Sequence, residues 1–260
     1  MTVIAARERR ARIAELVAES DRVDVAALTA QFGLSDASIR RDLLLLEGQG
    51  RLKRIHGGAI APHLALRQGV YATKIREHRD EKRRIAAAAA DLIRSGDVVL
   101  FDSGTTVALV PAYVAPALRS RSSITAVTHS MPVLVEMGSW EGPHLVALGG
   151  LYLPDYEAFV GPQTVASLKG LSADVAFLGC DGLTIEAGIT TPHVLVAEVG
   201  ATMAARARRV IALADSSKLG RPGFTTIVPL DQVDVLITDA GALPEQLLPI
   251  RSAGIEVIIA

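Results

Sequence analysis

The pattern that most limits the fold of this chain is a series of short apolar, β-branched runs beyond residue 97, separated by helix-length segments. Seven strands are expected, at Val98–Asp102, Ser123–Thr128, His144–Gly150, Asp174–Gly179, Val210–Asp215, Val233–Thr238 and Ile255–Ile259. Helices are expected at Thr105–Val114, Met131–Met137, Gly161–Leu168, His193–Arg208 and Pro244–Leu248. Such alternation produces parallel βαβ units, so it predicts an α/β domain with a mostly parallel sheet and helices on both faces.

Polar residues and glycines gather where these expected strands end, which is where ligands bind in such a sheet. The candidates are Asp102, Ser103, Gly104, Thr105, Thr106, His129, Gly149, Gly150, Asp181, Gly182 and Lys218. Backbone amides, hydroxyls and Lys218 suit a phosphate, with the start of the helix after FDSGTT adding its dipole. Asp102 and Asp181 can accept hydrogen bonds from sugar hydroxyls. The sequence therefore predicts a site for a phosphorylated polyol.

The first sixty residues have a different pattern, in which short helices precede a hairpin. Helices are expected at Arg7–Glu19, at Val25–Phe32 and from the N-cap Ser35 to about Glu47. Asp24 can cap the second helix, and Gly33 can end it because glycine tolerates the left-handed backbone of a sharp turn. The segment GRLKRIHGGA, residues 50–59, predicts a basic β-hairpin. Together these elements indicate a helix-turn-helix with a wing.

The last expected helix and the hairpin carry side chains suited to DNA. In this motif the start of the second helix enters the major groove, where small and hydroxyl side chains permit close approach and arginine reaches guanine or phosphate. The candidates on the helix are Ser35, Asp36, Ala37, Ser38, Arg40 and Arg41. The candidates on the hairpin, for the DNA backbone, are Lys53, Arg54 and His56.

The charge distribution agrees with a polyanionic partner for the N-terminal part. The chain has 27 Lys and Arg against 28 Asp and Glu, but residues 1–84 hold 17 basic and 11 acidic residues, which leaves 10 and 17 for the remainder. A basic third joined to an acidic remainder favours two parts with different partners. The alternative is a small three-helix domain with an ordinary basic surface.

The motifs of the N-terminal part resemble one family. VDVAALTAQFGLSDASIRRD, residues 23–42, and the following LLLLEGQGRLKRIHGGA resemble the N-terminal domain of the DeoR family of bacterial transcriptional regulators, which carries S-x-x-T-I-R-R-D-L and R-x-H-G-G-A. Ser38 stands where threonine is usual. The resemblance implies a winged helix-turn-helix that binds double-stranded operator DNA. It assigns base contacts mainly to Ser38, Arg40 and Arg41, without deciding which arginine reads a base, and phosphate contacts to the hairpin.

The C-terminal half resembles the effector domain of the same family. The matching pieces, in order, are EK at 81–82, DSGTT, LGG at 148–150, FVG at 159–161, ADVAFLG at 173–179, DG at 181–182, GIT at 188–190, AE at 197–198, DSSK at 215–218 and ITD at 237–239. That domain is similar in fold to ribose-5-phosphate isomerase, and its members usually sense phosphorylated sugars. The resemblance implies a repressor of a carbohydrate catabolism operon, released from its operator by such an effector. His129 and Gly200-Ala201 depart from the family pattern, which leaves the effector open.

The expected organisation is a DNA-binding domain at 1–58, a linker at 59–80 with a short strand or arm near Leu64–Tyr71, and an effector-sensing and oligomerisation domain at 81–260. The charged run at 78–84 is expected to be a solvated helix face or a contact with another domain or subunit. A homo-oligomer is expected because paired half-sites multiply specificity. With no apolar leader and no membrane-length apolar run, we expect a cytoplasmic protein.

An isomerase with an added DNA-binding domain is the alternative function. Isomerases of the similar fold carry D-G-x-D with a lysine shortly after, whereas here Asp181-Gly182 is followed by Leu183-Thr184 and the next lysine is Lys218. We therefore expect no enzymatic activity and no cofactor. The histidines lack metal-ligand spacing and Cys180 has no partner base, so no metal site and no catalytic thiol are expected.

Overall fold

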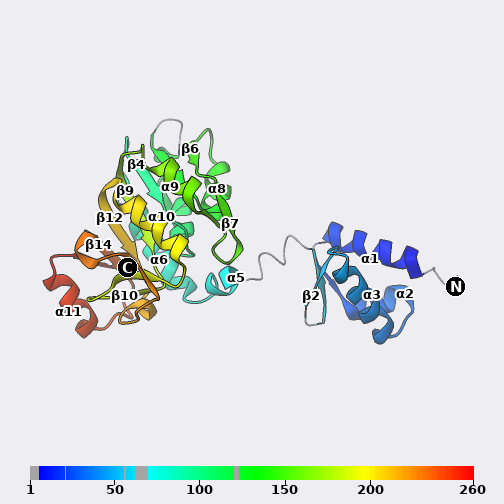
Figure 1. Cartoon of the computed structure of the whole chain (residues 1–260). Helices are drawn as coiled ribbons and strands as arrows, with labels where there is room; N and C mark the ends of the chain where they lie inside the picture. Colours follow the sequence, from blue (N-terminus) through cyan, green and yellow to red (C-terminus); the bar gives the residue numbers. More distant parts are fainter. Residues whose placement is uncertain (1–5, 21, 56, 62–69, 120–122) are drawn as a thin grey trace. The chain divides into compact units, whose positions relative to one another are not determined.

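The computed structural model describes residues 6–20, 22–55, 57–61, 70–119 and 123–260 (Figure 1). The chain divides into two compact units, Met1–Ala72 and Thr73–Ala260. His56 and residues 62–69 lie outside the described residues, and with them most of the strand or arm expected near Leu64–Tyr71. The end of that stretch is a short helix, α5 (Val70–Lys74), and not a strand.

Three helices form most of the first unit: α1 (Ala6–Ser20), α2 (Val25–Phe32) and α3 (Asp36–Gly48). Gly33 ends α2 in the left-handed region, with φ of 65°, and the Ser35 hydroxyl caps α3 by accepting the Ser38 N–H at 3.4 Å. Asp24 occupies the N-cap position of α2, but its carboxylate pairs with Arg22 at 3.1 Å and makes no cap bond. The helices enclose an apolar core that contains Ile13, Val17, Leu28, Ile39, Leu43 and Leu46.

The wing is the expected hairpin, β2 (Lys53–Ile55) and β3 (Gly58–Ile60), completed by β1 (Arg22–Asp24), a strand that the sequence pattern did not reveal. The antiparallel order is β1-β3-β2. Gly58 permits this sheet, because a Cβ atom there would lie 2.1 Å from the Val23 carbonyl oxygen. The predicted winged helix-turn-helix is confirmed.

The second unit contains all seven expected strands in one sheet: β4 (Val98–Phe101), β5 (Thr125–Thr128), β6 (His144–Ala147), β9 (Ala173–Gly179), β12 (Ala207–Leu213), β14 (Val235–Thr238) and β15 (Glu256–Ile259). Their order is β15-β14-β12-β9-β4-β5-β6, and every neighbouring pair is parallel. The predicted α/β class is therefore confirmed. The central strands β4 and β9 are almost wholly buried, and β12 is buried from Val210 onward, as their apolar sequences require.

Helices cover both faces of this sheet (Figure 1). One group of helices packs together on one face: α6 (Arg79–Ala90), the 3-10 turn η1 (Val107–Leu109), α7 (Val110–Tyr113) and α8 (Met131–Gly138). The other group is α9 (Pro162–Leu168), α10 (Val194–Ala204) and α11 (Pro244–Ser252). The helix expected at His193–Arg208 ends at Ala204, since β12 begins at Ala207. The helix expected at Thr105–Val114 is only η1 followed by one turn of α7.

Two small antiparallel sheets were not expected from the sequence. One pairs β7 (Leu151–Leu153) with β8 (Ala158–Val160), and the other joins β10 (Gly182–Thr184), β11 (Gly188–Thr191) and β13 (Thr225–Val228). Short 3-10 turns complete the unit at η2 (Pro116–Leu118), η3 (Pro154–Tyr156), η4 (Ser216–Lys218) and η5 (Leu230–Gln232).

The order of the large sheet fixes where a ligand can enter. The chain runs outward from β4 through β5 to β6 in one direction, and from β9 through β12 and β14 to β15 in the other. The direction reverses between β4 and β9, and crevices of doubly wound sheets open at the carboxyl ends of strands at such a reversal. The loops after β4 and β9 contain Asp102 and Asp181.

Candidate functional site

The start of α3 presents a short polar surface in the first unit. Asp36, Ala37, Arg40 and Arg41 are exposed, and Ser38 is partly exposed with its hydroxyl 3.1 Å from that of the cap Ser35. Arg40 lies 3.9 Å from Asp36, while Arg41 makes no ion pair with any described residue of this unit. Within the described ranges Arg41 is therefore a cation without an ion pair, close in sequence to small side chains, and such a group can read a base edge or hold a phosphate.

The family motif R-R-D at the centre of α3 ends in a buried acid. Asp42 is 5% exposed, and its carboxylate lies 2.7 Å from Arg9 Nε and 3.9 Å from Arg10 Nε of α1. A paired and buried carboxylate of this kind fixes the packing of α3 on α1, because losing one partner would leave an isolated charge.

The wing brings its basic residues beside the end of α3. Glu47 accepts hydrogen bonds from Arg54 Nε at 2.7 Å and from the Arg54 backbone N–H at 3.1 Å, and Lys53 Nζ lies 3.2 Å away. The Arg54 bonds, with help from Lys53, lower the pKa of Glu47 to about 2. A hollow of about 300 Å³ lies between α3 and the wing, lined by Val25, Arg40, Leu43, Arg54, Ile55, Gly57 and Gly58.

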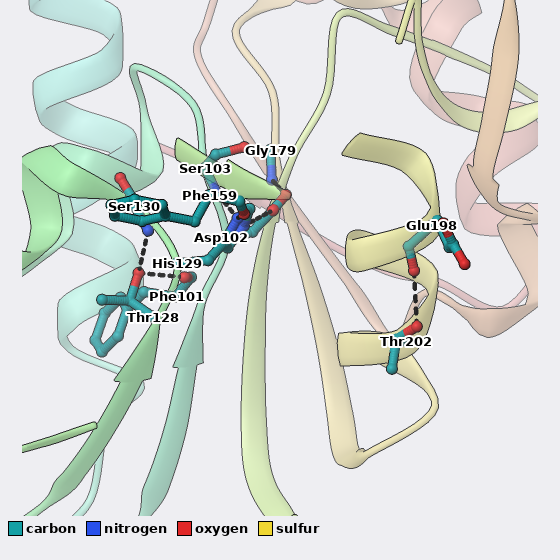
Figure 2. Close-up of polar contacts among 10 residues, drawn as sticks. All are labelled: Phe101, Asp102, Ser103, Thr128, His129, Ser130, Phe159, Gly179, Glu198 and Thr202. Carbon is teal, nitrogen blue, oxygen red and sulfur yellow. Dashed lines mark hydrogen bonds and ion pairs between the residues drawn. The ribbon is translucent and has the colours of Figure 1, made fainter. Parts of the chain in front are cut away.

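At the carboxyl end of β4, Asp102 is enclosed by protein groups and is 1% exposed (Figure 2). Its Oδ1 lies 2.9 Å from His129 Nε2 at the end of β5, and its Oδ2 accepts the Gly179 N–H from β9 at 3.2 Å. His129 is fully buried, and its Nδ1 lies 2.7 Å from the Phe159 carbonyl oxygen, so Nδ1 carries a proton. Asp102 and His129 thus connect the ends of three strands.

The FDSGTT loop turns directly after Asp102. Gly104 has φ of 116°, and a Cβ on Gly179 would lie 2.8 Å from the Ser103 carbonyl oxygen, so the loop and β9 need glycine to approach so closely. Ser103 and Thr106 are buried, while Gly104 and Thr105 are partly exposed. No long helix follows the loop, so the expected dipole contribution is small, because η1 and α7 are single turns. Amides and hydroxyls remain as the loop's donors.

A lysine that the sequence did not single out lies at the same edge. Lys82 belongs to the charged run expected to be a solvated face, yet it is 2% exposed, and its Nζ donates to the Lys74 carbonyl oxygen. Burial lowers the pKa of Lys82, the carboxylate of Asp215 opposes this shift, and the nearby charges of Lys218 and Lys74 add to it. Its neighbours Arg83 and Arg84 are indeed solvated, in exposed ion pairs with Asp80 and Glu81.

The topology explains how Lys82 reaches this edge. Helix α6 leads into β4 and runs back along the sheet, so the first turn of α6 lies at the carboxyl ends of the strands. Within the described residues Lys82 Nζ makes one hydrogen bond, which leaves two N–H groups for a ligand. Asp215, after β12, is 1% exposed and its buried Oδ2 has no hydrogen-bond partner in the described part of the chain.

Asp181, which follows β9, is held by groups from three elements. Its Oδ1 pairs with Lys74 Nζ of α5, and its Oδ2 accepts the Thr191 hydroxyl at 3.0 Å and contacts Tyr156 OH at 3.4 Å. Burial raises the pKa of Tyr156 to about 12, so its hydroxyl stays protonated as a donor. Lys74 and Tyr156 were also not expected as site residues.

The remaining candidates divide between two places: the polar cluster of Lys74, Lys82, Asp181 and Asp215, and a separate position at the edge of the sheet. Lys218 in η4 contributes to the electrostatics of both Lys82 and Cys180, which places it in the cluster. Gly182 has its backbone against the Arg221 carbonyl oxygen, where a Cβ would lie at 2.0 Å. Gly149 and Gly150 instead follow the edge strand β6, exposed and packed on Thr164. Their role as ligand contacts stays a prediction.

Cys180 follows β9 in the middle of this cluster. Burial, reinforced by the carboxylate of Asp181, raises the pKa of the thiol to about 12, so it carries no thiolate at neutral pH. No group of His, Cys, Asp and Glu within the described ranges has the arrangement of a metal site. None of the helices in the described part of the chain has the length and apolar character that a membrane crossing requires.

A winged helix-turn-helix joined to an α/β unit with polar residues gathered at the carboxyl ends of its strands indicates a DNA-binding regulator with a sensor domain. Family models agree: the DeoR-like helix-turn-helix domain matches residues 9–64, and the DeoR C terminal sensor domain matches residues 77–240. The chain belongs to the DeoR family of transcriptional regulators.

Individual relatives match along nearly the whole chain. The HTH-type transcriptional regulator GlpR of Haloferax volcanii is 36% identical over 251 residues, which cover 96% of each chain. The HTH-type transcriptional repressor GlcR of Bacillus subtilis is 31% identical over 239 residues, covering 92% of this chain and 90% of the relative. Among solved structures, ribose 5-phosphate isomerase A from Methanocaldococcus jannaschii is 20% identical with a TM-score of 0.40, over 55% of each chain.

Proposed function

We propose that this protein is a cytoplasmic, homo-oligomeric repressor of a carbohydrate catabolism operon. Helix α3 and the wing bind operator DNA, and a phosphorylated sugar in the crevice of the second unit releases it. Base contacts come from Ser38 together with one of Arg40 and Arg41, and backbone contacts come mainly from the wing, with His56 expected among them. Two copies are needed because one small module reads too few base pairs for high specificity.

The observation that carries the effector assignment is the presence of Lys82 and Asp215 at the carboxyl edge of the sheet, near enough for their charges to interact but not joined by an ion pair. Lys82 is 2% exposed and has spare N–H groups, while Asp215 is 1% exposed and its Oδ2 has no hydrogen-bond partner among the described residues. Unpaired buried charges and acceptors are costly, so a site of this kind is completed by a ligand that supplies the missing partners. A phosphate accepts from the lysine and a sugar hydroxyl donates to the carboxylate. One molecule that carries both groups satisfies both residues.

The rest of the crevice supports the same ligand class. Lys74 and Lys218 add positive charge for a phosphate dianion, and the loop from Ser103 to Thr106 adds amides and hydroxyls. Asp102 and His129 have partners on the polar atoms of both side chains. We infer that they hold the loop in place and that Asp215, whose Oδ2 has no hydrogen-bond partner in the described part of the chain, is the better reader of sugar hydroxyls.

A screen of sugar phosphates against the full chain tests this assignment. The fluorescence of Trp140, the single tryptophan of the chain, follows unfolding of the second unit during heating. We expect one class of sugar phosphate to raise the midpoint and to reduce binding of the chain to its preferred DNA. Lys82→Met should abolish both effects, while Lys169→Met, which removes an exposed lysine of the same unit, should preserve them. A sugar phosphate that acts equally on both variants would refute the site.

Isomerase activity is the second candidate function, and we propose that it is absent. The isomerase motif D-G-x-D has a second aspartate three residues after the first, and this chain has Thr184 at that position. Both oxygens of Asp181 also have protein partners. A base that must take a proton from substrate needs a free oxygen in reach. Turnover of pentose or hexose phosphates that disappears in Asp181→Ala would establish the enzyme in place of the pure sensor.

A further inference from the structure

Glu47 is an acidic residue on the DNA-binding side of the first unit, where an acid has an electrostatic cost. It lies near the end of α3, one turn beyond Leu43, and its side chain is 20% exposed. Any carboxylate close to a DNA backbone repels the phosphates, so charge alone predicts that its removal tightens binding. The contacts of Glu47 point to the opposite effect.

The chain folds back on itself to bring the wing to this acid. Gly50 takes φ of 69° and donates its N–H to the Glu47 carbonyl oxygen at 2.9 Å, which reverses the direction after α3. Leu52 is then buried in the apolar core, and Arg54 arrives beside the Glu47 carboxylate. Oε2 accepts from Arg54 Nε at 2.7 Å, and Oε1 accepts from the Arg54 backbone N–H at 3.1 Å.

These two bonds fix both the strand and the side chain of one residue. The backbone bond sets the position of β2 against α3, and the Nε bond sets the rotation of the guanidinium. An arginine held through Nε keeps its two terminal NH₂ groups for another acceptor. Arg54 also lines the hollow between α3 and the wing, together with Arg40.

We propose that Glu47 is the positioning residue of the wing and acts through Arg54. It holds Arg54 so that the two NH₂ groups, which have no hydrogen-bond partner among the residues the structure describes, receive one DNA backbone phosphate in the hollow together with Arg40. The hollow of about 300 Å³ has room for a phosphate group. Its walls add the backbone of Gly57 and Gly58, where no side chain obstructs the approach. Lys53, whose Nζ lies 3.2 Å from Glu47, is a weaker and more exposed partner of the same carboxylate.

This inference rests on the proposed DNA-binding role, so the test begins by establishing a DNA probe. The wild-type full chain is used to enrich duplexes from a random-sequence library, and an enriched duplex is compared with an unselected one by mobility shift. Glu47→Gln removes the charge but keeps an oxygen that can accept the Arg54 backbone bond. Glu15→Gln is the matched control, since Glu15 is an acid of α1 in an exposed ion pair with Arg12.

We expect Glu47→Gln to bind the enriched duplex about tenfold more weakly, which corresponds to about 1.4 kcal/mol, because the charged hydrogen bond that orients Arg54 is weakened. Binding to the unselected duplex should weaken by a similar factor, because a phosphate contact does not depend on base sequence, whereas Glu15→Gln should bind both duplexes as tightly as the wild type or more tightly. Far-UV circular dichroism confirms that each variant is folded.

The Arg54→Ala background separates positioning from a direct role of the acid. Arg54→Ala should reduce the slope of log affinity against log salt by about one phosphate contact. Adding Glu47→Gln to Arg54→Ala should then change nothing further. Equal or tighter binding of Glu47→Gln to the enriched duplex, or additive effects in the double variant, would overturn the inference alone. Failure to enrich any duplex would overturn the DNA-binding proposal and this inference with it.

Discussion

Replacing Asp102 with alanine is expected to destabilise the second unit strongly, because this carboxylate connects three strands. It is 1% exposed, with Oδ1 at 2.9 Å from His129 Nε2 and Oδ2 at 3.2 Å from the Gly179 N–H. Hydrogen bonds to a charged group are each worth about 1.5–3 kcal/mol, so the loss of the two contacts of this buried carboxylate should cost about 3–6 kcal/mol. At about 2–4 °C per kcal/mol for a domain of this size, the midpoint should fall by about 6–24 °C.

The fluorescence of Trp140, which is 8% exposed in the second unit, measures this transition in the full chain. Asp102→Asn, which keeps one oxygen and the volume of the side chain, should lose clearly less stability than Asp102→Ala. Asp231→Ala removes an exposed acid of the same unit and should stay within about 0.5 kcal/mol of the wild type. If Asp102→Ala unfolds like Asp231→Ala but no longer responds to the effector, the carboxylate contacts the ligand and the structural reasoning is refuted.

Three further predictions concern other parts of the molecule. Gly58→Ala should disrupt the wing and lower affinity for an enriched duplex, because its Cβ would lie 2.1 Å from the Val23 carbonyl oxygen; Gly48→Ala, with nothing within 4 Å, should fold normally by circular dichroism. Effector affinity should fall as pH rises through the lowered pKa of Lys82, because the phosphate binds the charged form of the amine. Calorimetry above about pH 7.5, where the phosphate is a dianion, measures this affinity, and a pH-independent affinity would contradict the prediction. The depressed pKa of Glu47, about 2 against 4.5, implies a stability contribution complete above about pH 4.5 and lost as pH falls toward 2; acid titration should therefore show wild type and Glu47→Gln converging in that window.

The sequence by itself determined the elements whose signal is local and periodic. All seven strands of the large sheet were predicted close to their observed positions, because buried parallel strands are continuous apolar runs bounded by turn residues. Helix α2 was predicted with its observed bounds, because Gly33 adopts the left-handed backbone conformation that ends the helix. Strand β1 and the small antiparallel sheets were missed, because these short strands lie outside the alternation of strand and helix and are defined by their partners.

The tertiary structure decided which polar residues meet and which are enclosed. Asp102 and His129 looked like ligand contacts because they follow strands, and only the packing of β4, β5 and β9 shows that they bind one another. Lys82 looked solvated within a charged run, and only the path of α6 back along the sheet buries it beside Asp215. Burial and pairing depend on contacts between residues far apart in the chain, so local sequence cannot supply them.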